Sequence, residues 1–161
     1  MVRPSRLTER RSNRGQAMVL AAVMRVVLLG TAALAVDLGY LYVTRNELQN
    51  IADGAALAGT RALGNIYQGL SYPEQQGYSC DQTCESTIRA AAQDVGTHNR
   101  AAGLDMTVRL EDIAIGRWDG ESFSPNLVQP DAVEVITRRD VIANGPVATF
   151  FARVLGKEEG S

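Results

Sequence analysis

The sequence predicts an α+β protein, in which a single N-terminal transmembrane helix continues into a long helical stalk and is followed by a small α+β domain with an antiparallel hairpin. Residues 17–36 are apolar, and a helical pattern continues from them to Leu63 without proline. Short strand patterns around an Asp-Gly turn follow. We divide the chain into a basic tail (1–16), a membrane-spanning helix (17–36), a helical stalk (37–63) and an α+β domain (64–161).

Charge separates the tail from the rest of the chain. The net charge is -2 and the pI is about 5.4, which does not favour a nucleic-acid partner. The tail nevertheless holds one acid, Glu9, against five arginines: Arg3, Arg6, Arg10, Arg11 and Arg14. Positive residues stay on the cytoplasmic side of a membrane. The sequence therefore predicts a single-pass inner-membrane protein with a cytoplasmic N-terminus and an extracytoplasmic domain.

The apolar run matches the requirements of a membrane span. About 20 helical residues cross a hydrocarbon core, and Tyr40 and Tyr42 follow the run as interfacial aromatic residues do. Arg25 is the only charge inside it, and a central arginine costs about 2.5–3.5 kcal/mol on insertion scales. The other residues outweigh that cost. Arg25 either extends toward the cytoplasmic side or pairs with an acid of a partner span.

A cleaved signal peptide is the alternative to an anchor. Residues 26–34 fit its apolar region, and Ala33-Leu34-Ala35 matches its cleavage pattern. Cleavage after Ala35 would cut the middle of a periodic helix. We therefore expect an uncleaved anchor that continues into the stalk.

Small residues in the span predict a helix–helix interface. Thr31, Ala35 and Gly39 are spaced by four, which lets two helices approach closely. We add Asp37 as a docking contact to another subunit's span, against the alternative of a solvated interfacial acid. In the stalk an apolar seam has near-heptad spacing, and it serves either packing on the domain or oligomerisation. Its members are Leu41, Leu48, Ile51, Ala55, Ala58 and Ala62.

The domain begins with a loop and a helix. Gly and Pro residues predict a loop over 64–81, and helical spacing predicts a helix over 85–99. The residues with this spacing are Ile88, Ala91, Ala92, Val95 and Ala102. Cys80 and Cys84 form a disulfide if the domain is exported, and otherwise remain free thiols.

Strands and a last helix complete the predicted domain. Strands are expected over 106–110, 113–118 and 132–137, with a two-residue Asp119-Gly120 turn that leads to Phe123. A helix is expected from Asn144 to Gly156. Its apolar stripe should pack on the sheet, and consists of Val147, Phe150, Phe151, Val154 and Leu155.

The sequence predicts no enzyme, metal or cofactor. His98 is the only histidine and looks like a surface residue, so a Cys/His zinc site is not expected. No nucleophile motif or phosphate-binding glycine loop is present in the sequence. Trp118 in the hairpin is interpreted as a core anchor, with a ligand platform as the alternative.

One segment resembles a known family. Residues 14–63 read RGQAMVLAAVMRVVLLGTAALAVDLGYLYVTRNELQNIADGAALAGTRAL. This segment resembles the N-terminus of TadE/TadG-like proteins of the Tad (Flp) pilus-assembly system. The likeness is carried by the Arg-Gly pair, the apolar run, AVDLG, LQN, AD and AALA together. A weaker likeness covers residues 114–126, 132–139 and 145–156.

The resemblance implies a membrane-anchored, non-enzymatic component of Tad/Flp pilus assembly that docks on other pilus-assembly proteins and supports adhesion and biofilm formation. A homo-oligomer is a further expectation. The alternatives are a minor pilin-like subunit in the fibre and an anchored or secreted ligand-binding module. Prepilin processing is not implied, because the fifth residue after Gly15 is Leu20 and not glutamate. Similar proteins continue beyond this point, so we expect a closing strand to be missing after Ser161.

Overall fold

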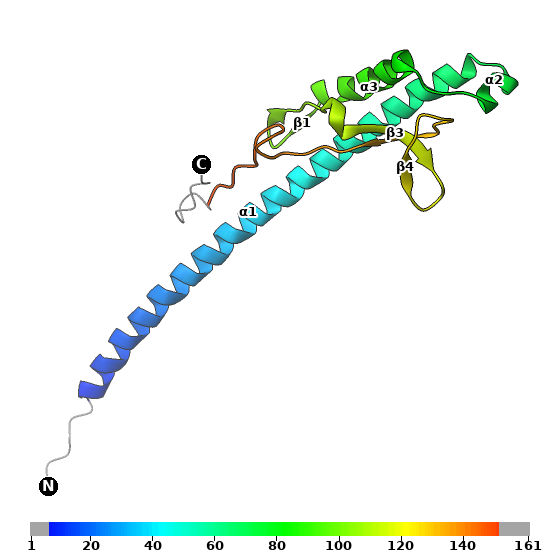
Figure 1. The fold of residues 1–161 in the computed structure, drawn as a ribbon. Coiled ribbons are helices and arrows are strands. Elements are labelled where there is room, and N and C mark those ends of the chain that lie inside the picture. Colours follow the sequence, from blue (N-terminus) through cyan, green and yellow to red (C-terminus); the bar gives the residue numbers. More distant parts are fainter. Residues whose placement is uncertain (1–6, 152–161) are drawn as a thin grey trace, which may run out of the picture. The chain divides into compact units, whose positions relative to one another are not determined.

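The computed structural model describes residues 7–151, and the side chains of residues 15–151. It confirms an α+β architecture with one long N-terminal helix and a small antiparallel sheet (Figure 1). The chain divides into two compact units, residues 1–40 with 149–161 and residues 41–148, and each is described by itself. The elements are α1 (Leu7–Gln68), α2 (Tyr72–Gln76), α3 (Gln82–Thr97), β1 (Arg100–Ala101), β2 (Leu104–Asp105), a 3-10 turn (Leu110–Asp112), β3 (Ile113–Trp118), β4 (Phe123–Pro125) and β5 (Ala132–Val135).

Helix α1 is a single helix that is longer than predicted at both ends. Leucine, alanine and other helix-favouring residues fill it, and no proline interrupts it. The loop predicted from Gly64 is wrong over residues 64–68, which stay helical. Ile66 and Tyr67 pack against the core, and the Gln75 side chain donates to the Tyr67 carbonyl oxygen at 2.9 Å. These contacts outweigh the low helix propensity of Gly64.

The predicted loop also contains the short helix α2. Ser71 precedes it, and both its backbone N–H and its hydroxyl donate to the Glu74 carboxylate, at 2.7 and 2.6 Å. This capping box lowers the pKa of Glu74, mainly through the bond from the hydroxyl. A serine and a glutamate three residues apart thus start a helix inside a segment that composition alone predicted to be irregular.

Helix α3 begins three residues earlier than predicted. Asp81 is its N-cap, and its carboxylate accepts a hydrogen bond from the Cys84 backbone N–H at 2.8 Å. The helix ends at Thr97, and Ala102 does not continue its apolar face. Ala102 and Gly103 have φ values of 51° and 75° in the turn between β1 and β2. Two left-handed residues close that hairpin, so the helical spacing at Ala102 was misleading.

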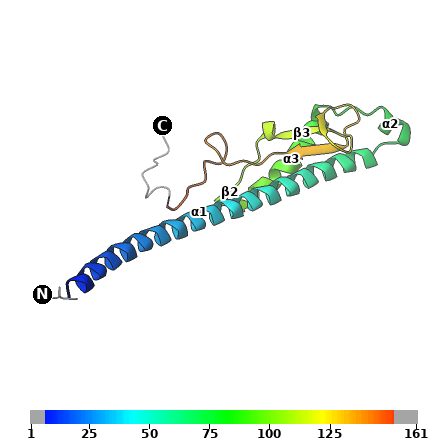
Figure 2. The same cartoon turned by 90° about the horizontal axis from the view of Figure 1, so that it is seen from below.

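The core of the 41–148 unit lies between α1, α3 and the sheet. Figures 1 and 2 show α3 and the sheet beside the same stretch of α1. Two glycines of α1 let the other elements approach. A Cβ on Gly54 would lie 3.3 Å from Val95 of α3, and a Cβ on Gly59 would lie 3.1 Å from Val133 of β5. The main buried residues are Ile51, Ala55, Leu63, Ile88, Ala92, Met106, Val108, Ile113 and Ile115.

The strand predicted over residues 106–110 is wrong, although Met106 and Val108 are buried as expected. Side chains replace a partner strand here. Asn144 accepts from the Thr107 N–H and donates to the Thr107 carbonyl oxygen, and Gln93 donates to the Val108 carbonyl oxygen. The alternating pattern therefore indicated burial correctly but not strand pairing.

Strands β3, β4 and β5 form an antiparallel sheet in the order β4-β3-β5. Strand β3 has the predicted bounds, and β5 ends two residues before the predicted strand end. The β3–β4 hairpin was predicted, but its loop spans residues 119–122 because Trp118 pairs with Phe123. Asp119 holds the loop, since its carboxylate accepts from the Glu121 and Ser122 N–H groups at 2.9 and 2.8 Å.

The helix predicted from Asn144 to Gly156 is wrong as far as residue 151, and residues 152–156 lie outside the described part. Asn144 has φ 59° and Gly145 has φ 69°, whereas an N-cap residue needs an extended backbone. Asp140 starts a tight turn here and accepts from the Ile142 and Ala143 N–H groups at 2.8 Å. Arg139 donates to the Asn144, Gly145 and Pro146 carbonyl oxygens, which keeps the segment non-helical.

Candidate functional site

The first half of α1 exposes a continuous apolar surface. Its large side chains are mostly more than half exposed, and they include Leu20, Val26, Leu28, Leu29 and Leu34. The helix reaches a mean hydropathy of 2.3 over 18 residues, so it is long and apolar enough to cross a membrane by length and composition. A helix that is apolar on all sides requires an apolar environment. This stretch is therefore one candidate functional surface.

The predicted small-residue row lies on that surface. Thr31, Ala35 and Gly39 are all exposed, and a Cβ added to Gly39 would meet no described atom within 4 Å. The Thr31 hydroxyl donates to the Leu28 carbonyl oxygen at 3.0 Å, which satisfies it within its own helix. A second helix could approach this row closely.

Asp37 does not lie with this row. At about 100° per residue it faces away from Ala35 and Gly39, and it is buried, with only 7% of its surface exposed. Its carboxylate accepts from the Phe150 N–H at 2.9 Å and from the Phe151 N–H at 3.0 Å. The structure thus uses Asp37 for a bond inside the chain, which neither of the two predicted roles included.

The aromatic residues beside this bond correct a further prediction. Phe150 was expected to pack on the sheet as part of a helical stripe. Its ring instead meets the ring of Tyr40 edge to face, with centroids 5.3 Å apart. Sequence reasoning missed the site because its two halves are separated by more than a hundred residues and have no shared pattern.

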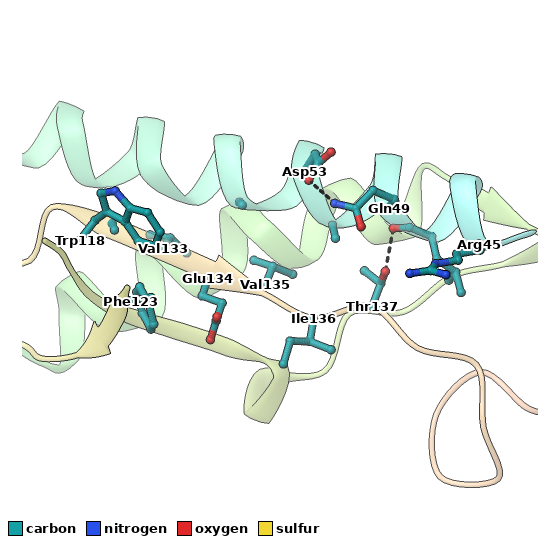
Figure 3. Close-up of a pocket in the computed structure, with 14 residues that line it drawn as sticks. Arg45, Gln49, Asp53, Trp118, Phe123, Val133, Glu134, Val135, Ile136 and Thr137 are labelled. Atoms are coloured by element: carbon teal, nitrogen blue, oxygen red, sulfur yellow. Dashed lines mark hydrogen bonds between the residues drawn. The ribbon is translucent and has the colours of Figure 1, made fainter. Parts of the chain in front are cut away.

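A groove in the 41–148 unit is a second candidate surface (Figure 3). It has a volume of about 570 Å³, and α1 and β5 form its two long walls. Trp118 lies at one end and Arg45 at the other (Figure 3). The indole of Trp118 is 53% exposed, so Trp118 lines this groove and is not the core anchor that was predicted.

Cys80 and Cys84 are joined by a disulfide in the structure, with their Cα atoms 5.3 Å apart. The bridge attaches the first turn of α3 to the segment before it, and both cysteines are buried. The Cys80 N–H also donates to the Leu127 carbonyl oxygen at 2.8 Å. The bridge therefore fixes the end of the 41–148 unit that carries α2.

The described residues offer no metal centre. No group of three His, Cys, Asp or Glu side chains gathers among them in a way that would hold an ion. His98 is exposed at the end of α3, where its ring nitrogen lies 2.8 Å from the Asp94 carbonyl oxygen. Both candidate surfaces are instead suited to contact with a lipid or a protein.

Residues 15–62 match the Tad family model, described as "Putative Flp pilus-assembly TadE/G-like". The match covers the exposed apolar stretch and most of the remaining helix α1, and it confirms the resemblance predicted for residues 14–63. Searches of curated proteins and of solved structures found no match to this chain. The weaker likeness over residues 114–156 remains a prediction.

Proposed function

We propose that the protein is a membrane-anchored, non-enzymatic component of Tad/Flp pilus assembly that acts by docking on other pilus-assembly proteins. The observation that carries this proposal is the family match over residues 15–62, which supports a role in pilus assembly. The first part of the matched segment also carries the exposed apolar side chains. An exposed apolar helix in a pilus-assembly segment is best explained by an anchor in the inner membrane.

The proposed topology follows from the charges around this helix. The arginines of residues 1–16 remain in the cytoplasm, and residues 41–148 fold on the other side of the membrane. The Cys80–Cys84 disulfide supports this orientation, because disulfides persist in oxidising compartments. Arg25 is in the half of the span nearer the cytoplasm, where its long side chain can reach the headgroups.

Docking within the membrane is assigned to the row of Thr31, Ala35 and Gly39. Small residues spaced by four allow two helix backbones to approach, and this row is exposed. The partner helix belongs to another pilus-assembly protein or to a second copy of this chain. Replacing Ala35 by leucine should reduce crosslinking between spans, whereas the same change at Ala22, an exposed residue about 140° around the helix from Ala35, should not.

Protease treatment of spheroplasts that express a C-terminally tagged chain tests the anchor. A membrane-bound chain of full length that external protease digests is the expected result. A soluble chain shortened by about 35 residues would identify Ala35 as a cleavage site and overturn the anchor. The pilus role is tested separately, by deleting the gene and measuring surface pili, adhesion and biofilm formation.

A minor pilin-like subunit is the second candidate function, favoured by the long apolar N-terminal helix. Such a subunit would leave the membrane with the fibre. Purified, sheared pili should therefore lack this protein if it is an assembly component, and contain it if it is a subunit.

A further inference from the structure

One edge of the sheet carries backbone groups that point away from it. Ile113 pairs with Val135 and Ile115 pairs with Val133. The Ile115 carbonyl oxygen accepts from the Asn126 N–H, on the side of β4, so the backbone of Ile115 faces away from β5. In an antiparallel pair, two residues that lie opposite each other either both form backbone hydrogen bonds across the pair or both point away from it. The N–H and C=O groups of Val133 and Val135, which lie opposite Ile115 and Ile113, therefore also point away from β3.

A second hydrogen bond confirms which backbone groups of β5 face β3. The Ile136 N–H donates to the Asp112 carbonyl oxygen. Because backbone groups alternate in direction along a strand, the even-numbered residues of β5 bond to β3 and the odd-numbered residues point outward. Within residues 7–151 there is no hydrogen bond from another element to the outward groups of Val133 and Val135. The outer edge of β5 is thus unpaired at two successive outward positions, Val133 and Val135, of which Val133 is 8% exposed.

The open edge faces a groove and not a flat surface. Helix α1 forms the opposite wall, where Ala52 and Ala56 present small side chains. The Gln49 amide on the same wall is directed along α1 and donates to Asp53 at 2.8 Å (Figure 3). The volume of about 570 Å³ is within the range of 300–1,000 Å³ that is usual for ligand sites. A strand added beside β5 would therefore find an edge to pair with and, over α1, space for its side chains.

The chemistry of the groove selects its occupant. The outward groups of Val133 and Val135 lie about 7 Å apart, which is the two-residue repeat of an extended backbone. A helix has already used its own backbone groups and cannot match them. The groove is lined by two acids, Asp53 and Glu134, against one base, Arg45, and this excess favours basic side chains in its occupant. Asp53 accepts a hydrogen bond from the Gln49 amide at 2.8 Å through one oxygen, and its second oxygen can accept from a ligand. The half-exposed Trp118 indole can stack on a cation.

We propose that the groove binds an extended segment of a partner protein, which adds to β5 as a further strand and places basic side chains along the groove, near Asp53, Glu134 or Trp118. Strand addition of this kind obtains affinity from the backbone and specificity from alternate side chains. The proposal goes beyond the pilus role and does not depend on it, because every residue involved lies within residues 41–148 and outside the exposed apolar stretch of α1.

Selection from a displayed library of random peptides tests the proposal, with the full-length protein held in detergent micelles. Peptides of about nine residues are long enough to form a strand of ordinary length. We expect selected peptides to be extended and basic, and to change the fluorescence of Trp118, the only tryptophan in the chain. Hydrogen exchange at the Val133 and Val135 amides should slow by at least about tenfold when a peptide binds.

Two variants make the test specific. Val135→Pro removes one outward N–H but no bond to β3, and an edge strand tolerates proline at such a position. It should weaken peptide binding by about tenfold or more. Ala52→Phe fills the groove from α1 without changing the sheet, and should also abolish binding. Ala90→Phe, at an exposed position of α3 outside the groove, is the matched control and should bind as the parent does.

Three results would overturn the proposal. The first is a library that yields no peptide, or only peptides that bind Val135→Pro and Ala52→Phe as tightly as the parent. The second is peptide binding that leaves the Val133 and Val135 amides unprotected. The third is protection of these amides that rises with protein concentration in the absence of peptide, because a second copy of the chain would then be the occupant. None of these results bears on the presence or absence of pili.

Discussion

The two halves of helix α1 differ both in composition and in how they expose their apolar residues. Arg25 is the only charge in residues 17–36, whereas residues 37–63 hold five charged side chains. Leu28 in the first half is 63% exposed, and its apolar neighbours are exposed on all sides of the helix. Leu63 in the second half is 2% exposed, at the end of a row in which Ile51, Ala55 and Gly59 are also buried. The second half has its apolar partners in α3 and the sheet, whereas the first half requires surroundings outside the described chain. Composition and exposure together therefore distinguish the two halves of one helix.

Truncating one leucine in each half should give the largest contrast. Leu63→Ala leaves a cavity in the core of residues 41–148 and should lower the free energy of unfolding by about 3 kcal/mol. Leu28→Ala removes the same atoms from an exposed position and should leave it unchanged. Denaturant unfolding in detergent, followed by Trp118 fluorescence, measures both. Equal losses for the two variants would contradict the division of α1.

Removing the disulfide should have the next largest effect, and only on the second half. The Cys80–Cys84 bridge closes a short loop, for which chain entropy predicts about 2 kcal/mol of stabilisation. The double variant Cys80→Ala, Cys84→Ala should lose that amount in the same unfolding experiment. Adding reductant to the parent protein should reproduce the loss and should not affect the variant. A parent protein that is indifferent to reductant would show that the bridge does not stabilise the domain.

Neutralising Asp37 tests the first half of the helix. Asp37→Asn keeps the shape of the side chain but replaces Oδ2 by an NH₂ group, so the Phe151 N–H loses its acceptor at 3.0 Å and keeps only Oδ1 at 3.3 Å. Hydrogen bonds to a charged group are worth about 1.5 kcal/mol or more, so exchange of the Phe150 and Phe151 amides should accelerate by about tenfold. NMR-detected hydrogen exchange measures this. Asp53→Asn is the control and should leave both rates unchanged.

Acid should have the smallest effect, confined to the turn at Asp140. The N–H groups of Ala143 and Ile142 hold the pKa of the Asp140 carboxyl below its ordinary value of 3.8. The folded turn therefore favours the ionised form, and this contribution is complete above pH 3.8 and is lost as the pH falls through the lowered pKa. The amide shifts of Ile142 and Ala143 should titrate with a midpoint below 3.8. A midpoint at or above 3.8 would exclude these bonds, and Asp140→Asn should abolish the titration.

Local patterns predicted the elements that depend on local interactions. The uninterrupted helix α1, helix α3, strand β3 and the hairpin after Trp118 all follow from periodicity and turn residues. The end of α1 was missed because Gln75, seven residues beyond Gln68, caps the helix. The segment at Thr107 was assigned to a strand because its alternation is that of a strand, yet its backbone bonds go to the Asn144 side chain.

The candidate surfaces were predictable to different extents. Thr31, Ala35 and Gly39 could be grouped from their spacing, because helix geometry alone places them on one face. The partners of Asp37 could not, since Phe150 and Phe151 are distant in sequence and were expected in a helix. The groove beside β5 was also missed, because the open edge of a strand depends on the order of the sheet and on which element faces it.

The bond between Asp37 and Phe150 has a consequence for the order of folding. It connects residues 113 positions apart, and the entropy lost on closing a loop grows with the number of residues inside it. All of residues 41–148 lie between the two partners, and contacts of such long range form after local ones. The attachment of residues 149–151 to α1 is therefore a late step in folding, which begins only when synthesis of the chain has passed Phe150.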